Sequence, residues 1–223
     1  MKFSYRNNGD FLTFYKNDSL IKVSENLPLI ATNSKHAELI LKDLRKKEGK
    51  PDQFSILGLS MFASSLDKKL INEIVLKLLK SLDFDLLLYR YFDDETLLKL
   101  MNQKYDPFIN NFNELFNIKL KVIEGFIENA NYLLNKKLFE KFIQKLNNFY
   151  LTALFKLSGI SKSVILSYFF LENKVDIPEF FKLINLENKF QQNHWGYVDE
   201  QKKNDQYYLS SLKKISFFLK NVN

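Results

Sequence analysis

Residues 186–200 read LENKFQQNHWGYVDE and hold the only tryptophan of the chain, Trp195. Just before and within this segment, Leu183, Leu186 and Phe190 recur at helical spacing. An apolar stripe with this period predicts a helix that packs one face against a core. The segment is therefore expected to begin as a helix that is packed against the rest of the protein.

The end of this helix is predicted at Gly196, because glycine adopts positive φ without a Cβ clash. Tryptophan is enriched both in cores and in exposed contacts, so Trp195 fits either role. Two acids, Asp199 and Glu200, follow directly. A helix end that carries an aromatic side chain and then projects acids from a turn is typical of a contact surface.

The composition indicates a globular protein. The 223 residues fit one large domain or two small ones, and 46% of them are hydrophobic, which is ample for a packed core. The absence of cysteine excludes disulfides and thiolate metal sites. No apolar run approaches the roughly 20 residues needed to cross a bilayer, and the first residues show no signal or transit pattern. We therefore expect a bacterial cytoplasmic protein rather than one of the mitochondrial matrix.

The net charge of +7 makes nucleic-acid binding the alternative function. Most basic residues are lysines, and the only arginines are Arg6, Arg45 and Arg90, whereas specific base contacts favour the bidentate arginine fork. The lysines are also scattered among acids, whereas a nucleic-acid-binding protein gathers them on one surface. The pattern favours an ordinary solvated lysine surface over a basic helical nucleic-acid-binding protein.

The first quarter of the chain is predicted to form a small sheet. Short runs rich in β-branched and aromatic residues, separated by turn signals, lie at residues 11–15, 20–23 and 29–31. A covering helix is expected to follow, capped by Asn33 or Ser34 and closed by Gly49 and Pro51. Residues 56–66 are interpreted as the passage between two lobes.

The rest of the chain is predicted to be mainly helical. Helices are expected at 68–82, from Asp93 or Asp94 to Met101, from Pro107 onward, at 136–157 with Gly159 as its end, at 161–171, from Pro178 to Trp195 and at 207–219. The helix at 161–171 is apolar around most of its circumference and should be buried. The alternating residues 118–123 favour a short extended piece. The predicted fold class is α+β: a small β-rich N-terminal lobe with a covering helix at 1–60, and a larger, mainly α-helical lobe at 61–223.

Residues that could carry catalysis are few. His36 and His194 have no acid at a recognised metal-ligand spacing, and His36 is expected at the surface or as a helix cap. The SGIS sequence at 158–161 lacks the context of a nucleophile elbow and fits a helix-to-helix turn. A hydrolase would need a pocket that gathers Ser158 or Ser161 with His194 and an acid. The six glycines are spread singly, which excludes a glycine-rich phosphate loop, and we expect no enzyme, no metal and no cofactor.

Asp85 and Arg90 flank the apolar run LLLY at 86–89. A charged pair that flanks such a run is usually exposed, but if either residue is partly buried here it needs a partner, because buried charges are usually paired. A structural ion pair is therefore favoured over a functional one.

Four motifs resemble, in order along the chain, the assembly chaperones of the ATP-twelve type, which act on the α subunit of the soluble catalytic head of ATP synthase in mitochondria and α-proteobacteria. They are DLLLYR at 85–90, Gln103 with Tyr105-Asp106-Pro107, LSGISKS at 157–163, and Leu186-Glu187 with Gln191, Gln192, Trp195 and Gly196. Tyr105 stands where the family usually has tryptophan. Asn17-Asp18-Ser19 replaces an Asp-Gly turn, and residues 57–64 lack the arginine that the family carries between its lobes.

The resemblance implies a non-enzymatic chaperone that binds the unassembled α subunit and protects its subunit interface until assembly. This task needs exposed apolar anchors rimmed by polar groups. Trp195, Phe190 and Tyr197 are the expected anchors, and Asp199 and Glu200 are expected to pair with basic residues of the client. The acid of the family aligns best with Asp199, or with Glu200 after a shift of one residue. A monomer is expected when the client is absent, with structural roles for Asp85, Arg90, Gln103, Asp106, Pro107, Gly159 and Gly196.

Overall fold

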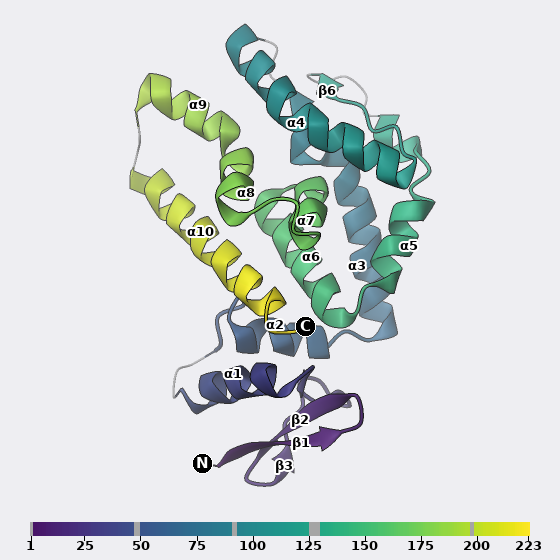
Figure 1. Ribbon diagram of the computed structural model, residues 1–223, viewed down its shortest axis with the longest axis vertical. Coiled ribbons are helices and arrows are strands. Elements are labelled where there is room, and N and C mark those ends of the chain that lie inside the picture. The colour runs from purple at the N-terminus through teal and green to yellow at the C-terminus, as the bar shows by residue number, and fades with distance from the viewer. Residues whose placement is uncertain (1, 47–49, 91–92, 125–129, 197–198) are drawn as a thin grey trace. The chain divides into compact units, whose positions relative to one another are not determined.

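The computed structural model describes residues 2–46, 50–90, 93–124, 130–196 and 199–223, with side chains for all of these except 124, 130 and 193–195. The chain divides into two compact units, and Figure 1 labels helices and strands of both. Unit 1 comprises Met1–Ile71, Leu146–Ala153 and Ser210–Asn223, and unit 2 comprises Asn72–Lys145 and Leu154–Leu209. The α+β class is confirmed, because a small antiparallel sheet precedes a long helical region. The domain boundary after residue 60 stays a prediction.

The elements of unit 1 form a small sheet with two helices. They are β1 (Phe3–Asn8), β2 (Phe11–Lys16), β3 (Ser19–Leu20), β4 (Ile30–Ala31), α1 (Ser34–Arg45) and α2 (Ile56–Ser64). β2 pairs antiparallel with β1 along its whole length and with β3 and β4 along its other edge. Asn17 and Asp18 both adopt positive φ, +48° and +63°, which suits a two-residue hairpin turn and confirms the predicted turn.

The helices of unit 1 cover the sheet. Asn33 caps α1 as expected, because its side-chain oxygen accepts a hydrogen bond of 2.9 Å from the backbone N–H of His36. α1 packs on β1 and β4, and α2 packs on α1. The largest fully buried side chains of this unit are Phe14, Leu29, Ile40, Leu59, Phe149 and Phe218.

Most of the helices belong to unit 2, and three of them also extend into unit 1. The remaining elements are α3 (Lys68–Ser81), η1 (Leu82–Phe84), η2 (Leu86–Leu88), β5 (Tyr89–Arg90), α4 (Glu95–Phe116), β6 (Ile123–Glu124), η3 (Ala130–Leu133), α5 (Lys137–Lys145), α6 (Asn148–Ser161), α7 (Val164–Leu171), α8 (Ile177–Ile184), α9 (Leu186–Trp195) and α10 (Asp199–Leu219). The shared helices are α3, α6 and α10. No helix within the described ranges is long and apolar enough to span a membrane.

An aromatic cluster forms the core of unit 2. Phe112 and Phe116 from α4 meet Phe139 from α5 and Tyr168 from α7, with ring centroids 4.9 Å apart for Phe112–Phe139 and 5.1 Å apart for Phe116–Tyr168. Rings at such distances and steep angles gain from edge-to-face contact in addition to area burial. All eight residues of α7 are buried, which confirms the prediction of a central helix.

Four sequence-based helix and strand assignments are wrong in their extent. The strand β1 was not predicted, and residues 56–64, expected as a passage between lobes, form α2. The predicted break at Asp106-Pro107 is absent, because Pro107 lies inside the 22-residue helix α4, which packs on η2, α7 and α9. The long helix predicted at 136–157 divides into α5 and α6, because Asn147 accepts hydrogen bonds from the N–H groups of Phe149 and Tyr150 and starts a new helix.

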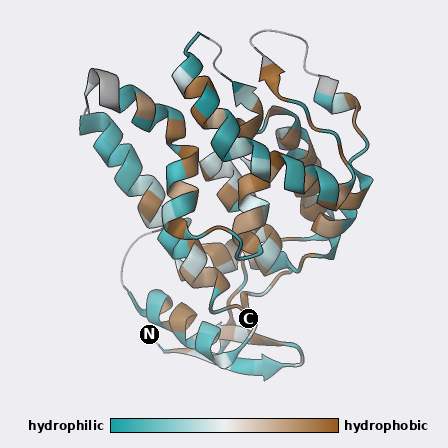
Figure 2. Ribbon diagram, turned by 45° about the horizontal axis from the view of Figure 1, so that its top comes forward, coloured by the Kyte–Doolittle hydropathy of each residue, from teal (hydrophilic) through white to brown (hydrophobic). Residues whose placement is uncertain are grey.

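Three further corrections concern the C-terminal third. Gly159 does not end its helix: α6 continues to Ser161, and Lys162 adopts the left-handed φ of +57° instead. The helix predicted from Pro178 to Trp195 is broken at the buried residue Asn185, which separates α8 from α9. The last helix begins at Asp199, eight residues earlier than residue 207, and Figure 2 shows this added part as hydrophilic.

Candidate functional site

The helix end at Gly196 is built as the sequence predicts. Gly196 has a φ of +86°, and its N–H donates a hydrogen bond of 2.9 Å to the carbonyl of Gln192, closing α9. A Cβ at this position would meet no atom within 4 Å, so only the backbone conformation favours glycine. Tyr197 and the side chains of His194 and Trp195 lie outside the described part of the chain. Their predicted roles therefore stay predictions.

The two predicted acids lie in the first turn of α10 rather than in a free turn. This placement is physically favourable, because the N-terminus of a helix carries a partial positive charge. Asp199 points into solvent, with 89% of its side chain exposed, and pairs with Lys202 one turn later at 3.0 Å. The apolar periodicity that begins at residue 207 could not show this start, because the first two turns carry almost no apolar residue.

Glu200 differs from its neighbour because it borders a polar pocket of about 290 Å³ in unit 2. The pocket lies between α9 and the first half of α10, and it is lined by Asn185, Asn188, Glu200, Gln201, Asn204, Asp205 and Tyr208. Asp205 is buried and accepts a hydrogen bond of 2.8 Å from Lys189, which offsets its charge. For Glu200 no such cation is recorded within the described ranges. The pocket therefore offers one uncompensated carboxylate among amide and hydroxyl groups, which suits a basic side chain.

Of the expected apolar anchors, only the side chain of Phe190 is described. It is half-buried on α9. On the same helix, the side chain of Gln192 accepts a hydrogen bond from the ammonium group of Lys189. Phe190 therefore contributes partly to packing, and the structure places it on the helix that forms one wall of the Glu200 pocket. Sequence reasoning missed Asn185, Asn188 and Asp205, although the asparagine-rich sequence around Leu186 was visible.

Asp85 is fully buried and joins two elements of unit 2. Its carboxylate caps η2 by accepting from the N–H of Leu87 at 3.1 Å, and it accepts from the N–H of Ile165 in α7 at 3.0 Å. A backbone bond of 2.9 Å from Leu86 to the carbonyl of Lys162 runs beside it. Burial raises the pKa of Asp85 to about 6, although the hydrogen bonds from Ile165 and its other donors act in the opposite direction.

Arg90 is buried, and its ionic partner is Asp106 rather than Asp85. Its guanidinium group donates to the side chain of Asn102 at 2.7 Å and lies 5.4 Å from the ring centroid of Tyr105. The Tyr105 hydroxyl in turn donates to the carbonyl of Leu183 at 2.9 Å. These contacts between motif residues that are far apart in sequence therefore hold the 85–90 segment and α8 against α4. Gln103 and Pro107 lie on the exposed side of α4.

The catalytic alternatives receive no support from the described side chains. Ser158 donates to the carbonyl of Phe155, and Ser161 donates to the carbonyl of Leu157, both at 2.9 Å. His36 is fully buried, which makes its predicted surface or cap position wrong. Among the described residues, no group of three or more histidines and acids could hold a metal ion.

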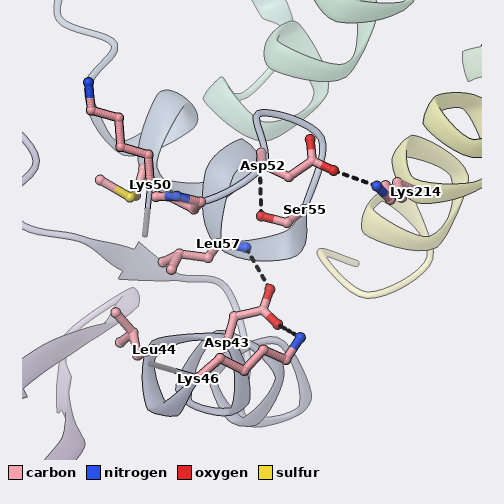
Figure 3. Close-up of a pocket in the computed structure, with 10 residues that line it drawn as sticks. Asp43, Leu44, Lys46, Lys50, Asp52, Ser55, Leu57 and Lys214 are labelled. Atoms are coloured by element: carbon pink, nitrogen blue, oxygen red, sulfur yellow. Dashed lines mark hydrogen bonds and ion pairs between the residues drawn. The ribbon is translucent and has the colours of Figure 1, made fainter. Parts of the chain in front are cut away.

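A second pocket, of about 520 Å³, lies in unit 1 between α1 and α2 (Figure 3). Asp43 pairs with Lys46 at 2.7 Å and Asp52 pairs with Lys214, so most of its charges already have protein partners. Burial opposes ionisation of Asp52, but the hydrogen bond from Lys214 holds the pKa of Asp52 below its ordinary value. None of the site residues predicted from sequence lines this pocket.

Comparison with solved structures identifies the fold. An aspartate-to-lysine mutant of Atp12p from Paracoccus denitrificans aligns with a TM-score of 0.81 and 19% identity over 100% of this chain and 96% of that chain. Atp12 from the same organism gives 0.81 and 18% over 100% and 97%, and a candidate chaperone from Agrobacterium tumefaciens gives 0.83 and 18% over 99% and 84%. No protein-family model and no curated protein sequence matches the chain. The chain therefore has the fold of Atp12, as the resemblance implied.

Proposed function

We propose that the protein is a non-enzymatic assembly chaperone that binds the unassembled α subunit of the ATP synthase catalytic head and protects its subunit interface until assembly. The observation that carries this proposal is the match of essentially the whole chain, both units included, to Atp12 structures. The four sequence motifs in matching order point to the same family. Because folds host many functions, the proposal also needs a site that can do the work.

The surface around the Glu200 pocket is the proposed client contact. Glu200 supplies a carboxylate that no described lysine or arginine pairs with, and the surrounding amides can orient the planar group of an arginine or the ammonium group of a lysine. Asp199 sits beside it and adds a second negative charge, partly offset by Lys202. Phe190, Trp195 and Tyr197 are the proposed apolar anchors. This contact would add specificity and encounter rate more than affinity, which suits a chaperone that must release its client.

Co-expression of the protein with the α subunit or the β subunit, followed by affinity purification, tests the proposal. We expect the wild type to retain α and not β. The Glu200→Ala variant should retain roughly tenfold less α, whereas the matched neighbouring variant Asp199→Ala should lose less, because Asp199 already has a lysine partner. Failure of the wild type to retain α would overturn the function. Equal retention by wild type and Glu200→Ala would keep the function and remove the site.

A further inference from the structure

Five exposed apolar side chains of unit 2 lie on α3 and α5 and in the short turns η1 and η3. We call this group the α3–α5 patch, and its members are Leu76, Phe84, Tyr132, Leu133 and Leu138. Leu133 is 72% exposed, Phe84 59% and Leu76 58%, which are the highest values among the large apolar residues described. Single exposed apolar residues are ordinary, but a group of them with polar surroundings marks an interaction surface.

A buried ion pair holds the segments of the patch together. Lys136, which directly precedes α5, pairs with Asp83 of η1, and both side chains are nearly buried. The same ammonium group donates to the carbonyl of Leu79 in α3 at 3.2 Å. In the sequence, Phe84 directly follows Asp83. Leu138 lies two residues after Lys136, and Leu133 lies three residues before it. Leu76 lies on α3 three residues before Leu79, whose carbonyl accepts from Lys136, so it is a neighbour of Leu79 on the helix surface.

The patch is not needed to fill the core of unit 2. On α5, Phe139 and Ile143 are fully buried and Phe139 contacts the aromatic cluster, whereas Leu138 is 49% exposed. On α3, Ile74, Val75 and Leu78 are buried and Leu76 is not. Each helix therefore has its own core stripe and carries an additional apolar residue outside it.

Lysines surround the patch. Lys77 and Lys80 are exposed on α3, and Lys137 and Lys141 are exposed on α5, one turn apart. The acids on the same surface are fewer: Glu73 is exposed on α3, Glu140 is half-buried on α5, and Asp83 is neutralised by Lys136. An apolar centre with a net positive rim is complementary to an amphipathic segment that carries acids.

We propose that the α3–α5 patch is a second client contact, which binds an acidic amphipathic segment of the same α subunit. This inference rests on the proposed function. The two contacts have opposite polarity, because the Glu200 pocket accepts a basic side chain and the patch accepts an acidic segment. A client that must satisfy both can bind in only one orientation, since reversing it brings like charges together.

The test uses the full-length protein and purified α subunit, with binding measured at low and at high salt. Phe84→Ser and Leu133→Ser each remove an exposed apolar side chain, and together they should weaken binding about tenfold at both salt concentrations. The matched control is Phe217→Ser, because Phe217 on α10 is 49% exposed and belongs to unit 1. It should bind like the wild type.

Charge reversal gives a second, independent variant. Lys137→Glu with Lys141→Glu should weaken binding several-fold at low salt, and the difference should shrink when salt screens the charges. The control is Lys213→Glu, an exposed lysine on α10. Unfolding midpoints equal to that of the wild type show that the variants are folded.

The outcomes separate the two proposals. If the wild type does not bind α, the proposed function fails and the patch inference fails with it. If the wild type binds α and all patch variants bind equally well, only the patch inference is overturned. Vesicles of anionic lipid serve as the competing probe: binding of the wild type to them, lost in the lysine variants while α binding is kept, would identify the patch as a membrane surface and overturn the inference.

Discussion

Protonation of His36 is expected to destabilise unit 1. The ring is fully buried, its Nδ1 atom accepts from the N–H of Thr32 at 3.3 Å, and its Nε2 atom lies 2.8 Å from the hydroxyl of Ser60. That hydroxyl donates to the carbonyl of Ile56 at 2.7 Å, so Nε2 carries the proton and donates to Ser60. The hydrogen bonds therefore assign a neutral histidine with one tautomer. A proton on Nδ1 would face the donor N–H of Thr32.

The size of the effect follows from the pKa. Burial lowers the pKa of His36 from 6.5 to about 4. The ring centroids of Phe149 and Phe218 lie 5.5 and 5.9 Å from that of His36, and these rings offer no counter-charge. The unfolded chain therefore binds the proton more tightly, so stability is complete above pH 6.5 and falls as the pH decreases towards 4. At about 1.4 kcal/mol for each pH unit, the full loss is about 3.4 kcal/mol, of which about 2 kcal/mol has been lost at about pH 5.

The assay is denaturant unfolding of the wild type and His36→Gln at about pH 7.5 and about pH 5, followed by hydrogen exchange of amides in unit 1. Glutamine keeps an amide near Ser60 and does not titrate, so the variant should be less stable at the higher pH but should lose about 2 kcal/mol less on acidification. Other titrating groups are present in both proteins and cancel in this comparison. Equal losses in the two proteins would refute the conclusion that burial keeps His36 neutral.

Three further predictions concern unit 2 and the helix end beside the Glu200 pocket. The stability contributed by Asp85 should change with pH in the opposite direction to that of His36. Burial raises the pKa of Asp85 from 3.8 to about 6 in the folded protein, so stability is lost as the pH rises through this range and the carboxyl group ionises. When the pH falls from about 7 to about 5, the free energy of unfolding of the wild type should rise by about 1 kcal/mol relative to that of Asp85→Asn. Hydrogen exchange of unit 2 amides measures this difference. Pro107→Ala should raise the free energy of unfolding by about 2 kcal/mol, because alanine restores the N–H that proline cannot offer to Gln103. Gly196→Ala should lower the free energy of unfolding by about 1 kcal/mol, because alanine is disfavoured at a φ of +86°. A thermal melt can measure this loss, and an unchanged midpoint would contradict the preference of this position for glycine.

Local signals in the sequence predicted those structural features that depend on only a few neighbouring residues. Side-chain chemistry within a few positions explains the cap at Asn33, the turn at Asn17 and Asp18, the buried helix α7 and the helix end at Gly196. Tertiary contacts decided the rest. Pro107 remains inside α4 because this helix packs on three other elements, which outweighs the missing hydrogen bond.

Parts of the candidate site were predictable and parts were not. The sequence identified Glu200 as a candidate, but it could not show that α10 begins at Asp199, because polar first turns carry no apolar period. It also could not pair Lys189 with Asp205, sixteen residues away on the next helix, and this pair leaves Glu200 as the acid of the pocket that no cation in the described part of the chain neutralises. Long-range pairing of this kind is fixed only by how two helices pack.

Most residues of the motifs that carry the family resemblance stabilise the fold. Asp85 caps η2 and holds α7, Arg90 and Asp106 join the 85–90 segment to α4, and Tyr105 reaches the carbonyl of Leu183. Such residues are restrained by packing whatever the protein binds. They carry little information about a partner. Evidence for the client must therefore come from residues that the fold does not need, namely Glu200 with its pocket and the exposed side chains of the α3–α5 patch.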